Sequence, residues 1–116
     1  LNEAMRLYSD GYASSDEIDA TIRDGLGLRW AFMGPFETID LNAPGGIKDY
    51  ISRYGPIFVE MAKNQTKIPD WSEEAGKKLE LERRKILGHE ELEDRAKKRN
   101  QLLKTLRKVK IDNGEV

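Results

Sequence analysis

The sequence predicts an all-α fold. No stretch alternates apolar and polar residues with β-branched enrichment, as a strand on a sheet surface would. Apolar residues instead recur at three- and four-residue spacing along most of the chain, which is the period of an amphipathic helix. Helix-starting signals precede several of these runs, among them Ser14 three residues before Glu17 and Gly34 directly before Pro35.

Two helices are expected before the first pair of glycines. The first covers residues 1 to about 10, and Gly11 suits the position just past its end. Its apolar face holds Leu1, Ala4, Met5 and Tyr8. The second begins with Ser14 as N-cap and Glu17 at its third position, a capping box, and stops near Gly25. Its apolar face holds Ile18, Ile22 and Leu26.

The stretch from 25 to 46 has the strongest local constraints. Gly25 and Gly27 take positive φ at little steric cost, so they predict a helix stop and a turn. The turn is expected to be buried because Leu28, Trp30, Phe32 and Met33 are apolar. A short helix opens at Gly34-Pro35 and ends at Ala43-Pro44-Gly45-Gly46. Its apolar stripe consists of Phe36, Ile39 and Leu41.

Three more helical stretches are expected, or four if Pro56 begins a helix of its own. One covers residues 46–54, where Pro56 either breaks or kinks it or begins a new helix to about 63, with Ile57, Phe58 and Met61 buried. After a loop over 64–68, a charged helix runs over 73–87 with Asp70 or Ser72 as its N-cap. Gly88 interrupts it, and His89 or a neighbour opens the last helix, which ends at Asp112-Asn113-Gly114.

Composition limits the class of protein. The 116 residues include 20 Lys plus Arg and 21 Asp plus Glu, so the formal net charge of -1 gives no reason to expect nucleic acid or an anionic membrane as partner. No apolar run reaches the roughly 18 residues of a membrane span. The absence of cysteine suits a reducing compartment, and we expect a cytoplasmic protein. Because Leu1 already lies in a helical pattern, we expect a fragment that begins inside a helix.

Catalytic chemistry is hard to find in this sequence. We expect the one histidine, His89, to be an exposed residue near a helix start. The acidic residues of 90–94 predict a solvated face, and no metal site or catalytic set is expected. Neither Gly25-Leu26-Gly27 nor Gly45-Gly46 has the strand–loop–helix setting of a nucleotide site. The basic last helix is interpreted as a charged surface that complements its own dipole, rather than as an RNA- or membrane-binding helix.

Arg29 is the most informative charge. The structural interpretation is a partly buried side chain that pairs with Glu37 or Asp40 or caps carbonyls near Gly25–Gly27. The functional interpretation is a cation for an anionic substrate, because a guanidinium binds a carboxylate through two parallel hydrogen bonds. Asn42 is a second candidate for the same pocket, and turn capping is its structural interpretation.

The order of motifs resembles the C-terminal domain of the 3-hydroxyacyl-CoA dehydrogenase superfamily, over roughly the first half of the chain. The matching pieces are Asn2-Glu3-Ala4, Asp16-Glu17-Ile18-Asp19, Gly25-Leu26-Gly27 and Met33-Gly34-Pro35-Phe36-Glu37. The stretch from 25 to 46 is most similar to the λ-crystallin/L-gulonate 3-dehydrogenase branch. The resemblance implies an all-α domain of the 6-phosphogluconate dehydrogenase C-terminal-like type. We expect residues 1–62 to form its core, N-terminally truncated, and residues 63–116 a charged helical extension.

The resemblance also implies a function. The implied protein is an NAD-dependent 3-hydroxy acid or 3-hydroxyacyl-CoA dehydrogenase, in which NAD and the catalytic residues belong to a Rossmann domain outside this chain. This chain would then supply substrate-binding and homodimer contacts and be inactive alone. The branch acts on small free acids, which favours a substrate role for Arg29, while acyl-CoA remains an alternative substrate. The alternative from another class is a non-enzymatic, crystallin-like structural or interaction module.

Overall fold

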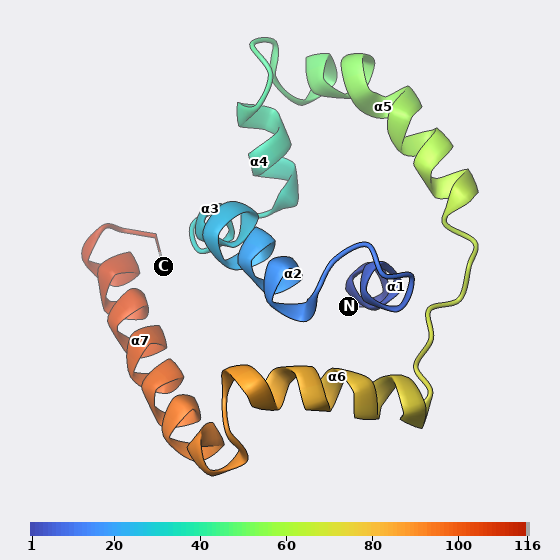
Figure 1. The fold of residues 1–116 in the computed structure, drawn as a ribbon. Helices are drawn as coiled ribbons and strands as arrows, with labels where there is room; N and C mark the ends of the chain where they lie inside the picture. The colour runs from blue at the N-terminus through green and yellow to red at the C-terminus, as the bar shows by residue number, and fades with distance from the viewer. Residues whose placement is uncertain (116) are drawn as a thin grey trace. The chain divides into compact units, whose positions relative to one another are not determined.

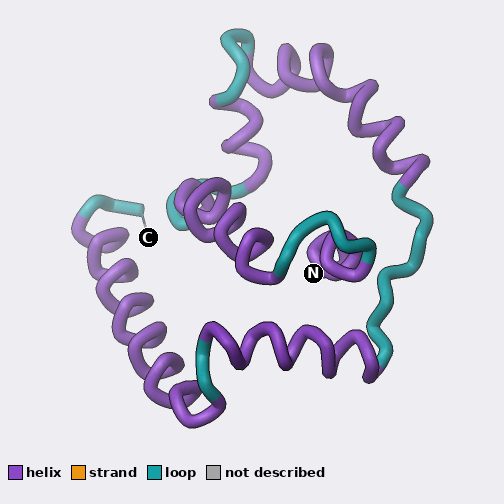
Figure 2. Tube along the Cα trace, viewed as in Figure 1, coloured by secondary structure: helices purple, strands orange, loops and turns teal. Residues whose placement is uncertain are grey.

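The all-α prediction is confirmed. The computed structural model describes residues 1–115, and every regular element in that range is a helix (Figure 1, Figure 2). The chain divides into two compact units, residues 1–70 and the part from Trp71 onward. The helices of the first unit are α1 (Asn2–Ser9), α2 (Ser15–Thr21), the π-helical turn η1 (Ile22–Leu26), α3 (Gly27–Trp30), α4 (Pro35–Leu41) and α5 (Gly46–Asn64). The predicted division of the domain at residue 62, into a core and a charged extension, stays a prediction.

The predicted signals around α1 and α2 are confirmed. Gly11 has φ 76°, and its N–H donates to the Tyr8 carbonyl oxygen at 3.1 Å, a bond typical of a glycine-ended helix. At the start of α2, the Glu17 N–H donates to Ser14 Oγ at 3.3 Å. The Ser14 N–H donates in return to Glu17 Oε2 at 2.8 Å, which completes the capping box.

The predicted helix stop at Gly25 and Gly27 is wrong. The helix that begins at Ser15 continues through α2, η1 and α3 to Trp30. Among the glycines of residues 1–115, positive φ occurs at Gly11, Gly46 and Gly114 alone. Gly25 and Gly27 therefore do not form a left-handed turn.

The predicted burial of the central stretch is also wrong. Trp30 is 50% exposed and Phe36 75%, and the other expected apolar residues are exposed as well, namely Leu28, Phe32, Leu41, Ile57, Phe58 and Met61. Met33 and Ile39 are half-buried. On α4 the buried residue is Thr38, whose hydroxyl donates to the Gly34 carbonyl oxygen at 2.8 Å. The periodicity of apolar residues thus predicted the helices, but most of the apolar side chains are exposed among residues 1–115.

Helix α5 is a single helix. It runs unbroken from Gly46 to Asn64 with Pro56 inside, so the prediction that a helix ends or begins anew at this proline does not hold. The missing proline N–H removes one helical hydrogen bond, but the helix continues through it. Tyr50 and Tyr54 lie one turn apart with ring centroids at 4.8 Å, and the Phe58 ring lies 6.3 Å from that of Tyr50.

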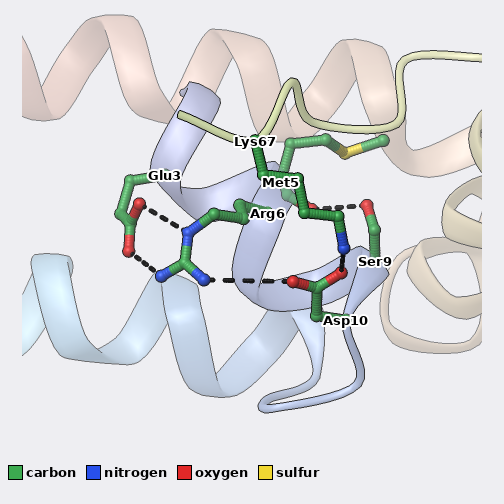
Figure 3. A network of polar contacts seen from close by, with 6 residues as sticks. All are labelled: Glu3, Met5, Arg6, Ser9, Asp10 and Lys67. Carbon is green, nitrogen blue, oxygen red and sulfur yellow. Dashed lines mark hydrogen bonds and ion pairs between the residues drawn. The ribbon is translucent and has the colours of Figure 1, made fainter. Parts of the chain in front are cut away.

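An ion-pair network links the end of α1 to the segment that follows α5 (Figure 3). Arg6 Nη2 lies 2.5 Å from Glu3 Oε1, and Arg6 Nη1 lies 3.9 Å from Asp10 Oδ2. Lys67, from the segment after α5, forms an ion pair with the other oxygen of Asp10. This network therefore joins residues 57 positions apart within the first unit.

The second unit consists of α6 (Glu73–Ile86), the 3₁₀ turn η2 (His89–Glu91) and α7 (Leu92–Asp112). Ser72 is the N-cap of α6, because its Oγ accepts from the Ala75 N–H at 3.2 Å. His89 opens the η2 turn, as expected. On α7, Lys97 Nζ lies 2.8 Å from Glu93 Oε1 one turn away, as on a solvated charged face. No helix in residues 1–115 is both long enough and apolar enough to cross a bilayer.

Candidate functional site

The side chain of Arg29 has no partner among residues 1–115. Arg29 is the third residue of α3, and its side chain is exposed rather than partly buried and forms no hydrogen bond or ion pair with the residues that the structure describes. Its backbone carbonyl oxygen accepts the N–H groups of Phe32 and Met33 at 3.0 and 3.1 Å. The expected pairing with Glu37 or Asp40 is therefore not formed, nor is the expected capping of nearby carbonyls. A guanidinium without an internal partner is available to an anion from outside the chain.

Asp40 is engaged elsewhere. Its Oδ1 accepts the Ile47 N–H at 2.7 Å, so a side chain near the end of α4 satisfies one of the open N–H groups at the start of α5. The turn between the two helices passes through Gly46, whose φ of 73° is in the left-handed region that favours glycine. A Cβ there would lie 2.8 Å from Asp40 Oδ1. Asp40 and Gly46 thus form a close-fitting corner between α4 and α5.

A second carboxylate supports the same corner. Asp49 Oδ2 accepts the Gly45 N–H at 3.1 Å, and Asp49 Oδ1 accepts Arg53 Nε at 2.7 Å. The hydrogen bond from Arg53, and after it the one from the Gly45 N–H, favours the charged form of Asp49. Together they hold the pKa of the Asp49 carboxyl below its ordinary value of 3.8.

Asn42 lies on this corner. It is the residue that ends α4, where its backbone N–H donates to the Ile39 carbonyl oxygen at 3.3 Å. Its side chain is exposed and makes no hydrogen bond with residues 1–115, so side-chain capping of the turn does not occur. No hydrogen bond joins Asn42 to Arg29. The two candidates come from different helices, and each has a polar group free to bind a ligand.

Apolar residues flank Arg29 in the sequence. Leu28 and Trp30 are exposed, and so is Phe32 just beyond the end of α3. None of these residues is able to act as nucleophile or base.

The structure also describes the other residues that were weighed as catalytic, metal-binding or nucleotide-binding. His89 is exposed, as predicted, and residues 1–115 contain no cluster of His, Asp and Glu able to hold a metal ion. Gly25–Gly27 lies within a helical run, and Gly45 and Gly46 are the N-cap and first residue of α5, so neither pair follows a strand as a dinucleotide loop does. These residues do not fit an NAD site. An open depression on α6 is lined by that helix alone and contains neither candidate.

The family of the chain follows from its sequence. The model of the C-terminal domain of 3-hydroxyacyl-CoA dehydrogenase matches residues 1–89. The chain belongs to this family. The motif order that predicted it and the helical structure agree with the match.

Similar proteins include λ-crystallins, the branch to which the stretch from 25 to 46 was compared, and L-carnitine dehydrogenases. The chain is 40% identical to a λ-crystallin homolog of Bos taurus over 79 residues, covering 68% of the chain and 24% of that protein. It is 36% identical to λ-crystallin of Oryctolagus cuniculus over 112 residues, covering 95% of the chain and 35% of that protein. L-carnitine dehydrogenase of Oceanobacillus iheyensis is 36% identical over 110 residues, covering 87% and 33%. The chain thus spans about a quarter to a third of the length of these curated relatives.

The contacts of two residues, Asp40 and Gly27, were not predicted from the sequence. Asp40 was considered only as a partner for Arg29, since an acceptor seven residues before the N–H it binds matches no short-range capping rule. Gly27 was assigned to a turn, whereas its N–H donates to the Ile22 carbonyl oxygen inside a helix. The spacing of Gly25 and Gly27 indicated an irregular backbone, but it did not distinguish a left-handed turn from a π-helical turn.

Proposed function

We propose that this chain is the C-terminal substrate-binding and dimerisation domain of a cytoplasmic NAD-dependent 3-hydroxy acid or 3-hydroxyacyl-CoA dehydrogenase. Membership in the 3-hydroxyacyl-CoA dehydrogenase C-terminal domain family supports it, as does the likeness to L-carnitine dehydrogenase. NAD and the catalytic groups belong to a separate Rossmann domain, in keeping with the lack of a dinucleotide loop in residues 1–115. The chain alone is inactive.

The free guanidinium of Arg29 carries the substrate part of this proposal. It binds the carboxylate of a small hydroxy acid, with two N–H groups directed at the two oxygens. The exposed apolar side chains next to it, such as Trp30, contact the carbon skeleton. Asn42 is the second candidate to donate a hydrogen bond to the substrate, from the end of α4. An acyl-CoA thioester has no carboxylate at this position, so the proposal favours a free acid.

The test uses the complete enzyme and measures KM. Arg29→Met removes the charge but keeps an unbranched stem, and should raise KM for a hydroxy acid about 10- to 100-fold, as expected for a lost charged hydrogen bond of about 1.5–3 kcal/mol. The KM for NAD and the melting temperature should not change. Arg23→Met is the matched control, because Arg23 precedes Arg29 in the same helical run and is already paired with Asp24 at 2.8 Å.

Two further measurements sharpen this test. The methyl ester of the acid lacks the anion, so Arg29→Met should leave its KM unchanged. Asn42→Ala should raise the KM of the acid a few-fold, since it removes one neutral hydrogen bond. If Arg29→Met left the kinetics of the acid at the wild-type level, the substrate role of Arg29 would be wrong.

Dimerisation is proposed to use the charged helices after Trp71. Leu103 of α7 is 55% exposed, and other apolar residues of that helix are exposed too, as expected of a surface that contacts another subunit. In the complete enzyme Leu103→Glu should convert dimer to monomer in light scattering coupled to size-exclusion chromatography. Thr105→Glu, two helical positions away and so on another face, should leave the dimer intact. A dimer unaffected by Leu103→Glu would place the interface elsewhere.

A non-enzymatic structural module is the second candidate, since two of the relatives reported above carry the crystallin name. One assay distinguishes the dehydrogenase from the structural module. The complete protein should reduce NAD when given a panel of hydroxy acids, which is followed by NADH absorbance. A correctly folded complete protein that binds no NAD would favour the structural module.

A further inference from the structure

The helix that carries Arg29 contains one extra residue. In an α-helix each N–H donates to the carbonyl oxygen four residues back, but the Gly27 N–H donates to Ile22, five residues back, at the end of the π-helical turn η1. Each helical residue turns the chain by about 100°. An extra residue before α3 therefore rotates Arg29 by about 100° relative to the direction that an uninterrupted helix from Ser15 would give it.

Gly27 is what permits this turn. A Cβ at this position would lie 2.6 Å from the Ile22 carbonyl oxygen and 3.4 Å from its carbonyl carbon. Both atoms are backbone, so they cannot move aside as the end of a flexible side chain could. A Cβ at Gly25 would meet nothing within 4 Å, although Gly25 lies in the same turn. The two glycines are therefore not equivalent, and only Gly27 must lack a side chain.

No other contact fixes the direction of Arg29. Its guanidinium has no hydrogen bond or ion pair with residues 1–115, so the α3 backbone alone determines where the side chain starts. Binding a carboxylate through two parallel hydrogen bonds requires the guanidinium to approach in the plane of the anion. A rotation of about 100° at the backbone would direct the side chain to another side of the helix, beyond what its flexible stem corrects without losing this geometry.

We propose that Gly27 is a positioning residue for the substrate carboxylate. By admitting the π-helical turn, it sets the direction in which Arg29 leaves the helix. This inference rests on the proposed binding of a free hydroxy acid by Arg29. It assigns to Gly27 a role in substrate specificity that it performs without touching the substrate.

The test is a double-mutant cycle in the complete enzyme. Gly27→Ala should raise KM for the hydroxy acid about tenfold, while kcat and the KM for NAD stay near wild type. In the Arg29→Met background, Gly27→Ala should have no further effect on KM, because no guanidinium is left to misplace. Gly25→Ala is the matched control and should leave KM unchanged.

A second variant covers the case in which Gly27→Ala does not fold. Deleting Gly25 removes the extra residue, so that a regular α-helix can form, and the KM for the hydroxy acid should again rise about tenfold. A folded deletion variant with wild-type KM overturns the proposal, and so does a failure of both variants to fold, which would make the turn a purely structural requirement.

The outcomes also separate the two proposals. Independent, multiplicative effects of Gly27→Ala and Arg29→Met on KM overturn the positioning role while leaving the substrate role of Arg29 intact. An Arg29→Met enzyme with wild-type KM overturns the substrate role, and the positioning role falls with it.

Discussion

Replacing Asp40 by alanine should loosen the corner between α4 and α5. The Ile47 N–H loses its acceptor at 2.7 Å, which is equivalent to losing the N-cap of α5, because Gly45 at that position has no side chain. Loss of such a cap lowers the free energy of unfolding by about 0.5–2 kcal/mol. Asp40→Asn should lower it less, since the amide oxygen still accepts a hydrogen bond.

Gly46 provides the second half of this prediction. Gly46→Ala places a Cβ at φ 73°, which destabilises by about 1–2 kcal/mol, and brings it 2.8 Å from Asp40 Oδ1. In the Asp40→Ala background that contact is gone and only the backbone strain remains. Gly46→Ala should therefore be less destabilising in that background than in the wild type.

Urea denaturation followed by circular dichroism measures both effects in the complete protein, as shifts in the transition midpoint at constant slope. Glu37→Ala is the control, because Glu37 is exposed on the same helix and has no partner among residues 1–115. It should change the stability by less than about 0.5 kcal/mol. If Asp40→Ala had no larger effect than Glu37→Ala, the corner would not depend on this hydrogen bond, and the reasoning would be refuted.

Four further predictions concern other parts of the chain. Ser14→Ala should lower the free energy of unfolding by about 1 kcal/mol in the same urea assay, because the capping box of α2 is lost. The lowered pKa of Asp49 means that its contribution is complete above about pH 4 and is lost as the pH falls through the folded-state pKa, so Asp49→Asn should flatten the acid limb of a stability–pH curve. Lys67→Met should cost less than about 1 kcal/mol at low salt and still less at high salt, since the pair with Asp10 is at the surface. The isolated chain should show no heat of NAD binding in calorimetry, and a measurable heat would contradict the assignment of NAD to another domain.

Signals that act over three or four residues were predictable from sequence. The capping box at Ser14 and the left-handed Gly11 depend only on neighbouring residues, so their physical causes can be read before the fold is known. The same holds for Pro35 at the first position of α4. These local rules sufficed for the helical class and for most helix ends.

Features that depend on distance through space were not predictable. Glycine allows a positive φ, or close approach of another group, and Gly27 uses the second where the first was expected. Asp40 binds an N–H seven residues along, beyond any helix-capping pattern. The substrate role of Arg29 stays a prediction from its chemistry, and the lack of an internal partner for its side chain could be known only once Asp40 was seen to be engaged with Ile47.

The ion pair between Lys67 and Asp10 closes a loop of 57 residues. Bringing the ends of a flexible segment of that length together has an entropic cost of roughly 3.6 kcal/mol beyond a constant, from the logarithmic dependence on loop length. An exposed ion pair supplies at most about 1 kcal/mol. The ion pair alone is therefore too weak to bring these two segments together. We expect the Lys67–Asp10 ion pair to break when the first unit unfolds, but to contribute little to the melting temperature of that unit.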